Sequence, residues 1–182
     1  VGIRDVDHWF LKETQDSIRG LVYLINQIED EKIKDFYSIC LASSIRPVSR
    51  ATTQQGRLFL DVVTAKEDCL DTFVKKAQKA IKAVSSLPES KSTIDIAEHD
   101  ASAPFSFGPT NKLIIVHPPY FNSYKYSSVN SLELSWMRIN HAEVRKSEVR
   151  EFFKVGKAEN IIHYVEDMRS TLNNIVATLS PD

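Results

Sequence analysis

Glycine is scarce in this sequence, and the glycines that are present are scattered. Only five of the 182 residues are glycine, whereas an average protein has about 7%. A backbone loop that wraps a dinucleotide, ATP or a nucleoside needs clustered glycines, so that the main chain can approach the ligand. No two glycines here lie within ten residues of each other. The sequence therefore has no such loop, and most of the site for a nucleotide-like cofactor would lie elsewhere.

Cysteines and long apolar runs are also few. Cys40 and Cys69 are the only cysteines, and neither has the spacing of a metal site, so we expect no metal and a reducing, cytoplasmic location. No stretch approaches the roughly 18 apolar residues of a membrane helix, and the first ten residues lack the layout of a secretory signal. With 42% hydrophobic and 26% charged residues, the composition excludes disorder and indicates one ordinary domain without a membrane partner.

Apolar residues at helical spacing predict four long helices. The first covers residues 7–29, and the second begins near Ile33 and is ended by Pro47. The third covers residues 65–87, and the last covers residues 158–179. A charged segment over 143–154 is expected to be helical as well, whereas residues 46–56 read as a polar loop.

Short extended runs alternate with these helices. Residues 93–97 (TIDIA) and 112–116 (KLIIV) are predicted to be neighbouring parallel strands, and residues 57–63 are either a short strand or an extended lead into the next helix. The β-branched run 112–116 is typical of a strand that is buried on both faces of a parallel sheet. Helices that alternate with buried strands indicate an α/β fold.

The segment after the second run carries the chemistry. The predicted strand leads directly into His117-Pro118-Pro119-Tyr120, and Asn122, Tyr124 and Tyr126 follow. Ligands of open α/β sheets bind at the carboxyl ends of the strands. Two prolines stiffen the backbone there and donate no N–H of their own, while the next residue offers a flat aromatic face. This combination suits a planar ring that bears an amino group.

These residues resemble the S-adenosylmethionine-dependent DNA amino-methyltransferases, which modify adenine N6 or cytosine N4. The family signature is a strand, then Asp, Asn or Ser, then Pro-Pro and an aromatic residue. In one bacterial branch an Asn, a Tyr pair and a Leu-Glu-Leu helix start follow, as Leu132-Glu133-Leu134 does here. Residues 9–50, including SSIRPVSR at 43–50, are similar to the helical insert of that branch.

The resemblance implies an incomplete Rossmann-like methyltransferase fold with an N-terminal helical insert. The insert would cover residues 1–56, and residues 57–182 would belong to the α/β domain that carries the Pro-Pro-Tyr motif. His117, Pro118, Pro119 and Tyr120 would be catalytic, and the pocket for the target base would hold Asn122, Tyr124 and Tyr126. The resemblance assigns Asp100, in the acidic turn after residues 93–97, to the adenosine of S-adenosylmethionine. The expected partner is double-stranded DNA.

The sequence differs from that family at two points. The glycine-rich cofactor loop is absent, so the chain resembles the later part of a longer methyltransferase, and the missing N-terminal cofactor-binding part would belong to the same or another chain. His117 replaces the usual Asp, Asn or Ser, and an imidazole accepts a hydrogen bond only through an unprotonated nitrogen.

Three interpretations therefore stay open. The first is a DNA methyltransferase, the second is an amino-methyltransferase acting on RNA bases or protein glutamine, and the third is a degenerate, non-catalytic binding module. Residues 138–157 hold six basic and three acidic side chains. This excess of positive charge fits two alternatives equally well, contact with phosphates or an ordinary surface helix. The candidates for nucleic-acid contact are Arg138, Arg145, Lys146 and Arg150.

Overall fold

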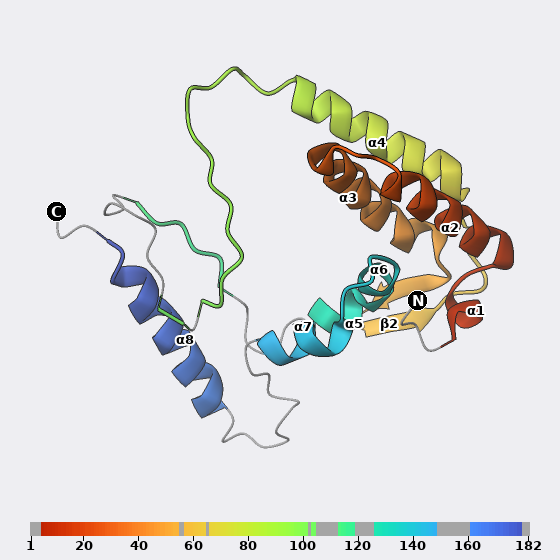
Figure 1. Cartoon of the computed structure of the whole chain (residues 1–182). Coiled ribbons are helices and arrows are strands. Elements are labelled where there is room, and N and C mark those ends of the chain that lie inside the picture. Colours follow the sequence, from red (N-terminus) through yellow and green to blue (C-terminus); the bar gives the residue numbers. More distant parts are fainter. Residues whose placement is uncertain are drawn as a thin grey trace. The chain divides into compact units, whose positions relative to one another are not determined.

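The computed structural model describes residues 5–54, 57–64, 66–101, 103–104, 113–118, 126–148 and 161–179. The chain divides into two compact units. The first comprises Val1–Ser90 and Lys125–Arg145, and the second comprises Lys91–Tyr124 and Lys146–Asp182. Most of the described helices and the only described sheet belong to the first unit (Figure 1).

The helix predicted over residues 7–29 is broken into two. α1 covers Val6–Trp9 and α2 covers Lys12–Asn26, because Phe10 between them adopts an extended conformation. Phe10 is buried in the core, and its carbonyl accepts a hydrogen bond from Nε2 of the buried Gln15 (3.2 Å). The same Nε2 donates to the carboxylate of Asp7 (2.6 Å), so the two hydrogen bonds of one buried amide hold the break in place.

The second predicted helix is confirmed as α3, Glu31–Val48. The side chain of Asp30 caps its N-terminus by accepting from the backbone N–H groups of Lys32 and Ile33. Pro47, which was expected to end the helix, lies in its last turn, and the helix ends one residue later at Val48.

A β-hairpin follows α3, where the sequence predicted a polar loop. β1 (Ala51–Gln54) pairs antiparallel with β2 (Arg57–Leu60), and Ala51 lies opposite Leu60. The prediction of a loop over residues 46–56 is therefore wrong, since pairing with β2 makes a strand of the largely polar ATTQ segment. The expected domain boundary at residue 56 falls between the two paired strands.

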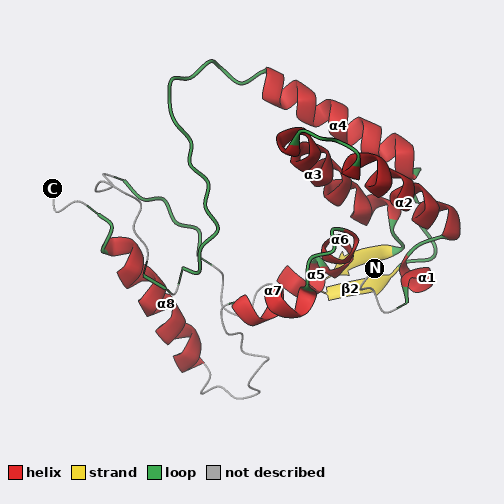
Figure 2. Ribbon diagram, in the orientation of Figure 1, coloured by secondary structure: helices red, strands yellow, loops and turns green. Residues whose placement is uncertain are grey.

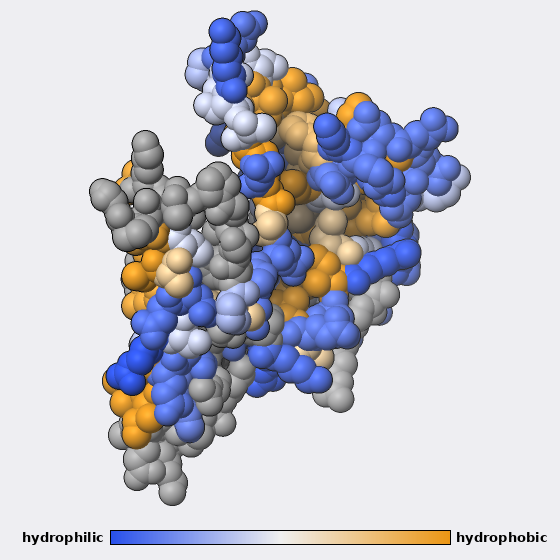
Figure 3. Space-filling model, turned by 60° about the vertical axis from the view of Figure 1, so that its left-hand side comes forward, coloured by the Kyte–Doolittle hydropathy of each residue, from blue (hydrophilic) through white to orange (hydrophobic). Residues whose placement is uncertain are grey.

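The third predicted helix is observed as α4, Cys69–Ser85, which packs against α2 and α3 so that the three lie side by side (Figure 2). Only part of its apolar face is buried, through Cys69, Thr72 and Ala77. Leu70, Val74, Ile81 and Val84 are between 46% and 58% exposed. Apolar residues are accordingly visible among hydrophilic ones at the molecular surface (Figure 3).

Two short helices complete the first unit's core. α5 covers Tyr126–Val129 and α6 covers Ser131–Trp136. Leu132 and Trp136 of α6 are buried, and the indole of Trp136 meets the ring of Phe10 edge-on at 5.7 Å between centroids. The same core contains apolar side chains of α2, α3 and the hairpin, among them Ile18, Leu21, Ile25, Leu41, Ile45, Val48 and Ala51.

The remaining described helices are α7 (His141–Ser147) and α8 (Ile161–Val176). α8 lies within the predicted helix 158–179, whereas α7 begins two residues before the predicted segment 143–154 and overlaps its first part. Met168 of α8 is buried, whereas Ile161, Val165 and Leu172 on the predicted apolar face are 41–49% exposed.

The two predicted parallel strands are not formed in the described residues. Residues 93–97 and 113–116 belong to no strand, and Lys112 lies outside the described residues. A strand needs a hydrogen-bonded neighbour, and an apolar strand also needs a packed face. Ile94, Ile96, Leu113 and Ile115 are instead 77–93% exposed. The α/β architecture therefore stays a prediction.

Both cysteines are buried in the first unit. Burial, with a smaller contribution from the neighbouring Asp68 carboxylate, raises the pKa of the Cys69 thiol to about 11, and burial also raises the pKa of Cys40. We expect the Cys69 thiol to react with a disulfide reagent at pH 8 about a hundredfold more slowly in the folded chain than in urea, because the thiolate is the reactive form, and we expect Cys40 to be slowed as well. Rapid labelling of the folded chain would contradict this.

The same shift makes stability depend on pH. The unfolded thiol ionises first, near pH 8.5, so the free energy of unfolding should decrease as the pH rises beyond that value. Chemical denaturation at pH 7 and pH 10, with a Cys69→Ala variant as the control, measures the contribution of this thiol.

Candidate functional site

Arg46, at the end of α3, joins four elements of the first unit. Its Nε donates to Oε1 of Glu133 (3.1 Å) and its Nη2 to Oε2 of the same carboxylate (2.9 Å). Nη1 donates to Oγ1 of Thr53 on β1 (2.6 Å), and Nη2 also donates to the backbone carbonyl of Val129 at the end of α5. The side chains of Arg46 and Glu133 are only 22% and 19% exposed.

The contact joins two segments that carry the methyltransferase resemblance. Arg46 belongs to SSIRPVSR and Glu133 to Leu-Glu-Leu, 87 residues apart in the chain. A planar guanidinium matches a carboxylate through two parallel hydrogen bonds, which fixes orientation as well as distance. The pair therefore holds α6 against the end of α3.

The sequence predicted neither member of this pair as a functional residue. The available signal is the position of each charge beside buried apolar residues. Arg46 follows Ile45, and Glu133 follows Leu132, and both of these apolar side chains are 0–1% exposed. A charge in such surroundings needs a partner, but sequence alone does not say which charge supplies it.

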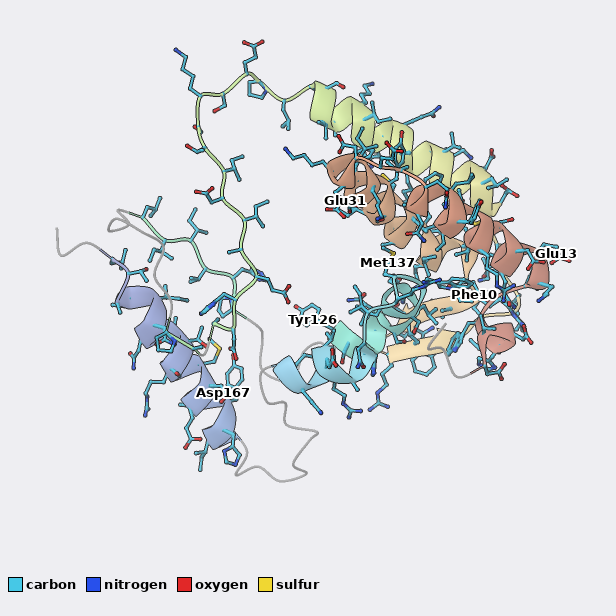
Figure 4. The ribbon with its side chains drawn as sticks, viewed as in Figure 1. Phe10, Glu13, Glu31, Tyr126, Met137 and Asp167 are labelled. Carbon is cyan, nitrogen blue, oxygen red and sulfur yellow. The ribbon has the colours of Figure 1, made fainter. Side chains whose placement is uncertain are left out.

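The expected catalytic and base-binding residues are only partly described. Tyr126, the first residue of α5, is 47% exposed and belongs to the first unit (Figure 4). His117 and Pro118 are exposed and belong to the second unit. The other four predicted residues lie outside the described residues: Pro119, Tyr120, Asn122 and Tyr124. The predicted pocket for a base therefore stays a prediction.

Asp100, the predicted cofactor residue, is exposed and begins a turn. Its carbonyl accepts from the backbone N–H of Ala103 (2.9 Å), and the side chain of Asn174 on α8 donates to the carbonyl of Ala101 (3.3 Å). Gly20, inside α2, is the one glycine in the described part. The site for S-adenosylmethionine therefore stays a prediction.

The predicted phosphate-binding residues follow α6. Arg145 and Lys146 are exposed on α7, and Arg150 lies outside the described residues. Arg138 stands directly after the C-cap residue of α6 with φ 59°, in the left-handed region. Its backbone N–H donates to the carbonyl of Ser135 (3.2 Å), and that of Ile139 donates to the carbonyl of Leu134 (2.8 Å).

These two hydrogen bonds form a Schellman motif, the helix end that usually has glycine in the left-handed position. An arginine there is strained, because its Cβ crowds the backbone. Non-glycine residues in this conformation are concentrated at functional sites, so the strain marks Arg138 as a candidate for binding.

Comparisons with protein families, curated proteins and solved structures find no match to this chain. Within the described ranges, no helix has the length and apolar character needed to cross a membrane. The same ranges contain no group of three or more His, Cys, Asp or Glu side chains placed to hold a metal ion.

Removing one partner of the Arg46–Glu133 pair should destabilise the first unit. We expect Arg46→Met to lower the free energy of unfolding by about 2–3 kcal/mol, because it leaves a largely buried carboxylate without its partner. Combining it with Glu133→Gln in a double-mutant cycle should give a coupling energy of at least about 1 kcal/mol.

The matched control is the pair formed by Lys75 and Asp71 on α4, whose side chains are both 73% exposed. Lys75→Met and Asp71→Asn should couple by less than about 0.5 kcal/mol. Equal coupling energies for the two pairs would mean that the Arg46 contact has no special role.

The strain at Arg138 gives a second expectation. Arg138→Gly should raise the free energy of unfolding by about 1 kcal/mol, because glycine adopts a positive φ without the Cβ penalty. Arg138→Ala keeps the Cβ and should not show this gain. Denaturant titration of both variants distinguishes relief of backbone strain from loss of the guanidinium.

Proposed function

We propose that this chain is the catalytic-motif part of an S-adenosylmethionine-dependent DNA methyltransferase that acts on the exocyclic amino group of adenine or cytosine. The observation that carries the proposal is the order of residues from Leu113 to Leu134. An apolar extended run precedes His-Pro-Pro-Tyr, and Asn122, Tyr124, Tyr126 and Leu-Glu-Leu follow at the spacing of that family.

The arrangement of the first unit supports the proposal. The segment after the Pro-Pro-Tyr motif begins α5 at Tyr126 and continues into α6, whose Glu133 is fixed by Arg46. Since Arg46 belongs to the part that resembles the helical insert, the two sets of residues that suggested the family are in contact. If the sequence resembled the family only by chance, these two segments would have no reason to be in contact.

The exposed apolar side chains of residues 93–97 and 113–116 are a second argument that part of the sheet is missing from this chain. Ile94, Ile96, Leu113 and Ile115 are of the type that buried strands contain, yet they are almost fully exposed. We infer that further strands, with the residues that hold the cofactor, come from another part of the same chain or from a second chain. S-adenosylmethionine would supply the methyl group there.

The residues of this chain would act on the base. A base inside a duplex is inaccessible, so the enzyme would extrude it into a pocket. Tyr120 would stack on the base, while a neutral His117 and the carbonyl of Pro118 would accept hydrogen bonds from the amino group and orient its lone pair. Arg138, Arg145, Lys146 and Arg150 would contact the phosphates of the duplex.

The alternatives differ in substrate or in activity. An enzyme that modifies RNA bases or glutamine could use the same loop, but the helical insert at residues 1–56 favours the DNA branch. A degenerate module would keep the binding surface without catalysis, and His117 in place of Asp, Asn or Ser favours that alternative. Methyl incorporation into duplex DNA, RNA and glutamine peptides distinguishes the three.

In a complete enzyme that carries this segment, Tyr120→Ala should reduce methyl incorporation about tenfold to a hundredfold. The loss corresponds to a stacking contact of roughly 1–3 kcal/mol. Tyr120→Phe keeps the aromatic face and should retain most of the activity. Equal losses in the two variants would show that stacking is not the role of this ring.

His117→Asn tests the acceptor. Asn is one of the residues that the family has at this position, and its amide oxygen accepts hydrogen bonds. His117→Asn should therefore preserve or raise methyl incorporation into duplex DNA. A large loss of activity in His117→Asn would contradict the acceptor role, and no incorporation by either enzyme with the cofactor part present would favour the degenerate module.

A further inference from the structure

A groove on the first unit lies between α2 and the end of α6. It consists of two adjoining hollows of about 390 Å³ and 160 Å³, which share Val22, Asn26, Trp136 and Arg138 in their walls. The smaller hollow reaches Met137, where the end of α6 approaches α3 (Figure 4). The larger one has the size of a small-molecule site, for which about 300–1,000 Å³ is usual.

The walls of the groove are cationic. Arg19 and Arg138 line the larger hollow, and the described residues in the walls of the two hollows include no Asp or Glu. The guanidinium of Arg138 makes no ion pair within the described ranges. The backbone of the same residue adopts the strained left-handed conformation. Nη1 of Arg19 pairs with Asp16 at 2.7 Å and its Nη2 donates to Oε1 of Gln15 at 3.1 Å. The side chains of Arg19 and Asp16 are substantially exposed, so a phosphate can compete with Asp16 for this guanidinium.

The remaining lining residues provide aromatic faces and amides. Tyr23 is 65% exposed and presents a ring at the edge of the larger hollow. Asn26 and Gln27 add side-chain amides, each of which both donates and accepts hydrogen bonds. Trp136 lines both hollows, and its buried indole N–H has no hydrogen-bond partner in the part of the chain that the structure describes.

We propose that this groove binds a nucleotide, with the phosphate on Arg19 and Arg138 and the base on Tyr23. Guanidinium groups bind phosphates strongly, aromatic side chains stack on bases, and the amides of Asn and Gln match the donor and acceptor edges of bases. The groove combines these three chemistries within one hollow. The nucleotide is either a free mononucleotide or one unit of a nucleic-acid strand.

Nucleotide binding in the groove does not depend on methyl transfer, because the described residues that line the groove include none from the Pro-Pro-Tyr segment. His117 and Tyr120 can be changed without touching the groove, and Arg19 and Tyr23 can be changed without touching the motif. Arg138 belongs to both proposals, so variants of Arg19 and Tyr23 test the groove alone, and variants of His117 and Tyr120 test the motif alone.

The test is calorimetric titration of the 182-residue chain with AMP, CMP, adenosine, inorganic phosphate and a short single-stranded oligonucleotide. A nucleotide should bind at least tenfold more tightly than either adenosine or phosphate, since only the nucleotide engages both parts of the groove. Arg19→Gln, Arg138→Gln and Tyr23→Ala should each weaken binding at least fivefold, whereas Tyr23→Phe should retain it. Arg57→Gln removes a charge outside the groove and should change the affinity less than twofold.

Each outcome decides the question. Tighter binding of AMP or CMP identifies a free nucleotide, and tighter binding of the oligonucleotide with the same dependence on Arg138 identifies a strand. Phosphate that binds as tightly as AMP overturns the nucleotide assignment. The absence of saturable binding, or binding that is equally affected by Arg57→Gln and Arg138→Gln, overturns the site.

Discussion

The hydrogen bonds of the Arg46 guanidinium are the interaction on which the first unit depends. The guanidinium donates to a carboxylate, a hydroxyl and a backbone carbonyl from three elements, and Arg46 itself belongs to a fourth. This contact holds α6, α6 carries Trp136, and Trp136 packs edge-on against Phe10. Phe10 is the residue at which the first predicted helix breaks. A single polar contact thus connects the position of α6 with the entry of α2 into the core.

A lysine could not replace this arginine. Its ammonium is a single point of charge and cannot form two parallel hydrogen bonds to one carboxylate. The contact is also largely shielded from water, so salt would screen it less than it screens the exposed pairs on α2 and α4. The Arg46–Glu133 pair should therefore be less sensitive to ionic strength than the exposed ion pairs of the same unit.

The elements that the sequence predicted well are those that depend on local periodicity. α3 is found where apolar spacing and Pro47 placed it, and the segments predicted around α4 and α8 contain those helices. The break at Phe10 could not be predicted, because it depends on hydrogen bonds from Gln15 five residues later. β1 was missed for a similar reason, since its residues become a strand only through pairing with β2.

The candidate site shows the same division. The Pro-Pro-Tyr motif is visible in the sequence as a local pattern, whereas the contact between Arg46 and Glu133 spans 87 residues and has no local signature. The groove beside α2 is also invisible to sequence reading, because Arg19 and Arg138 come from segments far apart in the chain. The runs 93–97 and 112–116 were predicted to be strands from their β-branched residues. Those residues indicate a preference for strands but do not determine which segment would pair with them.

The exposure of those extended runs has a consequence for how the protein is made. Ribosomes add about 5–20 residues per second, and domains made first fold first. Covering strands that precede Ile94 in the same chain would already be available when it emerged, and the apolar side chains would be uncovered only for seconds. Covering strands in a second chain would have to arrive by diffusion, and the waiting time would then depend on how abundant that chain is. During that time the runs would be open to chaperones and to pairing with other copies of themselves.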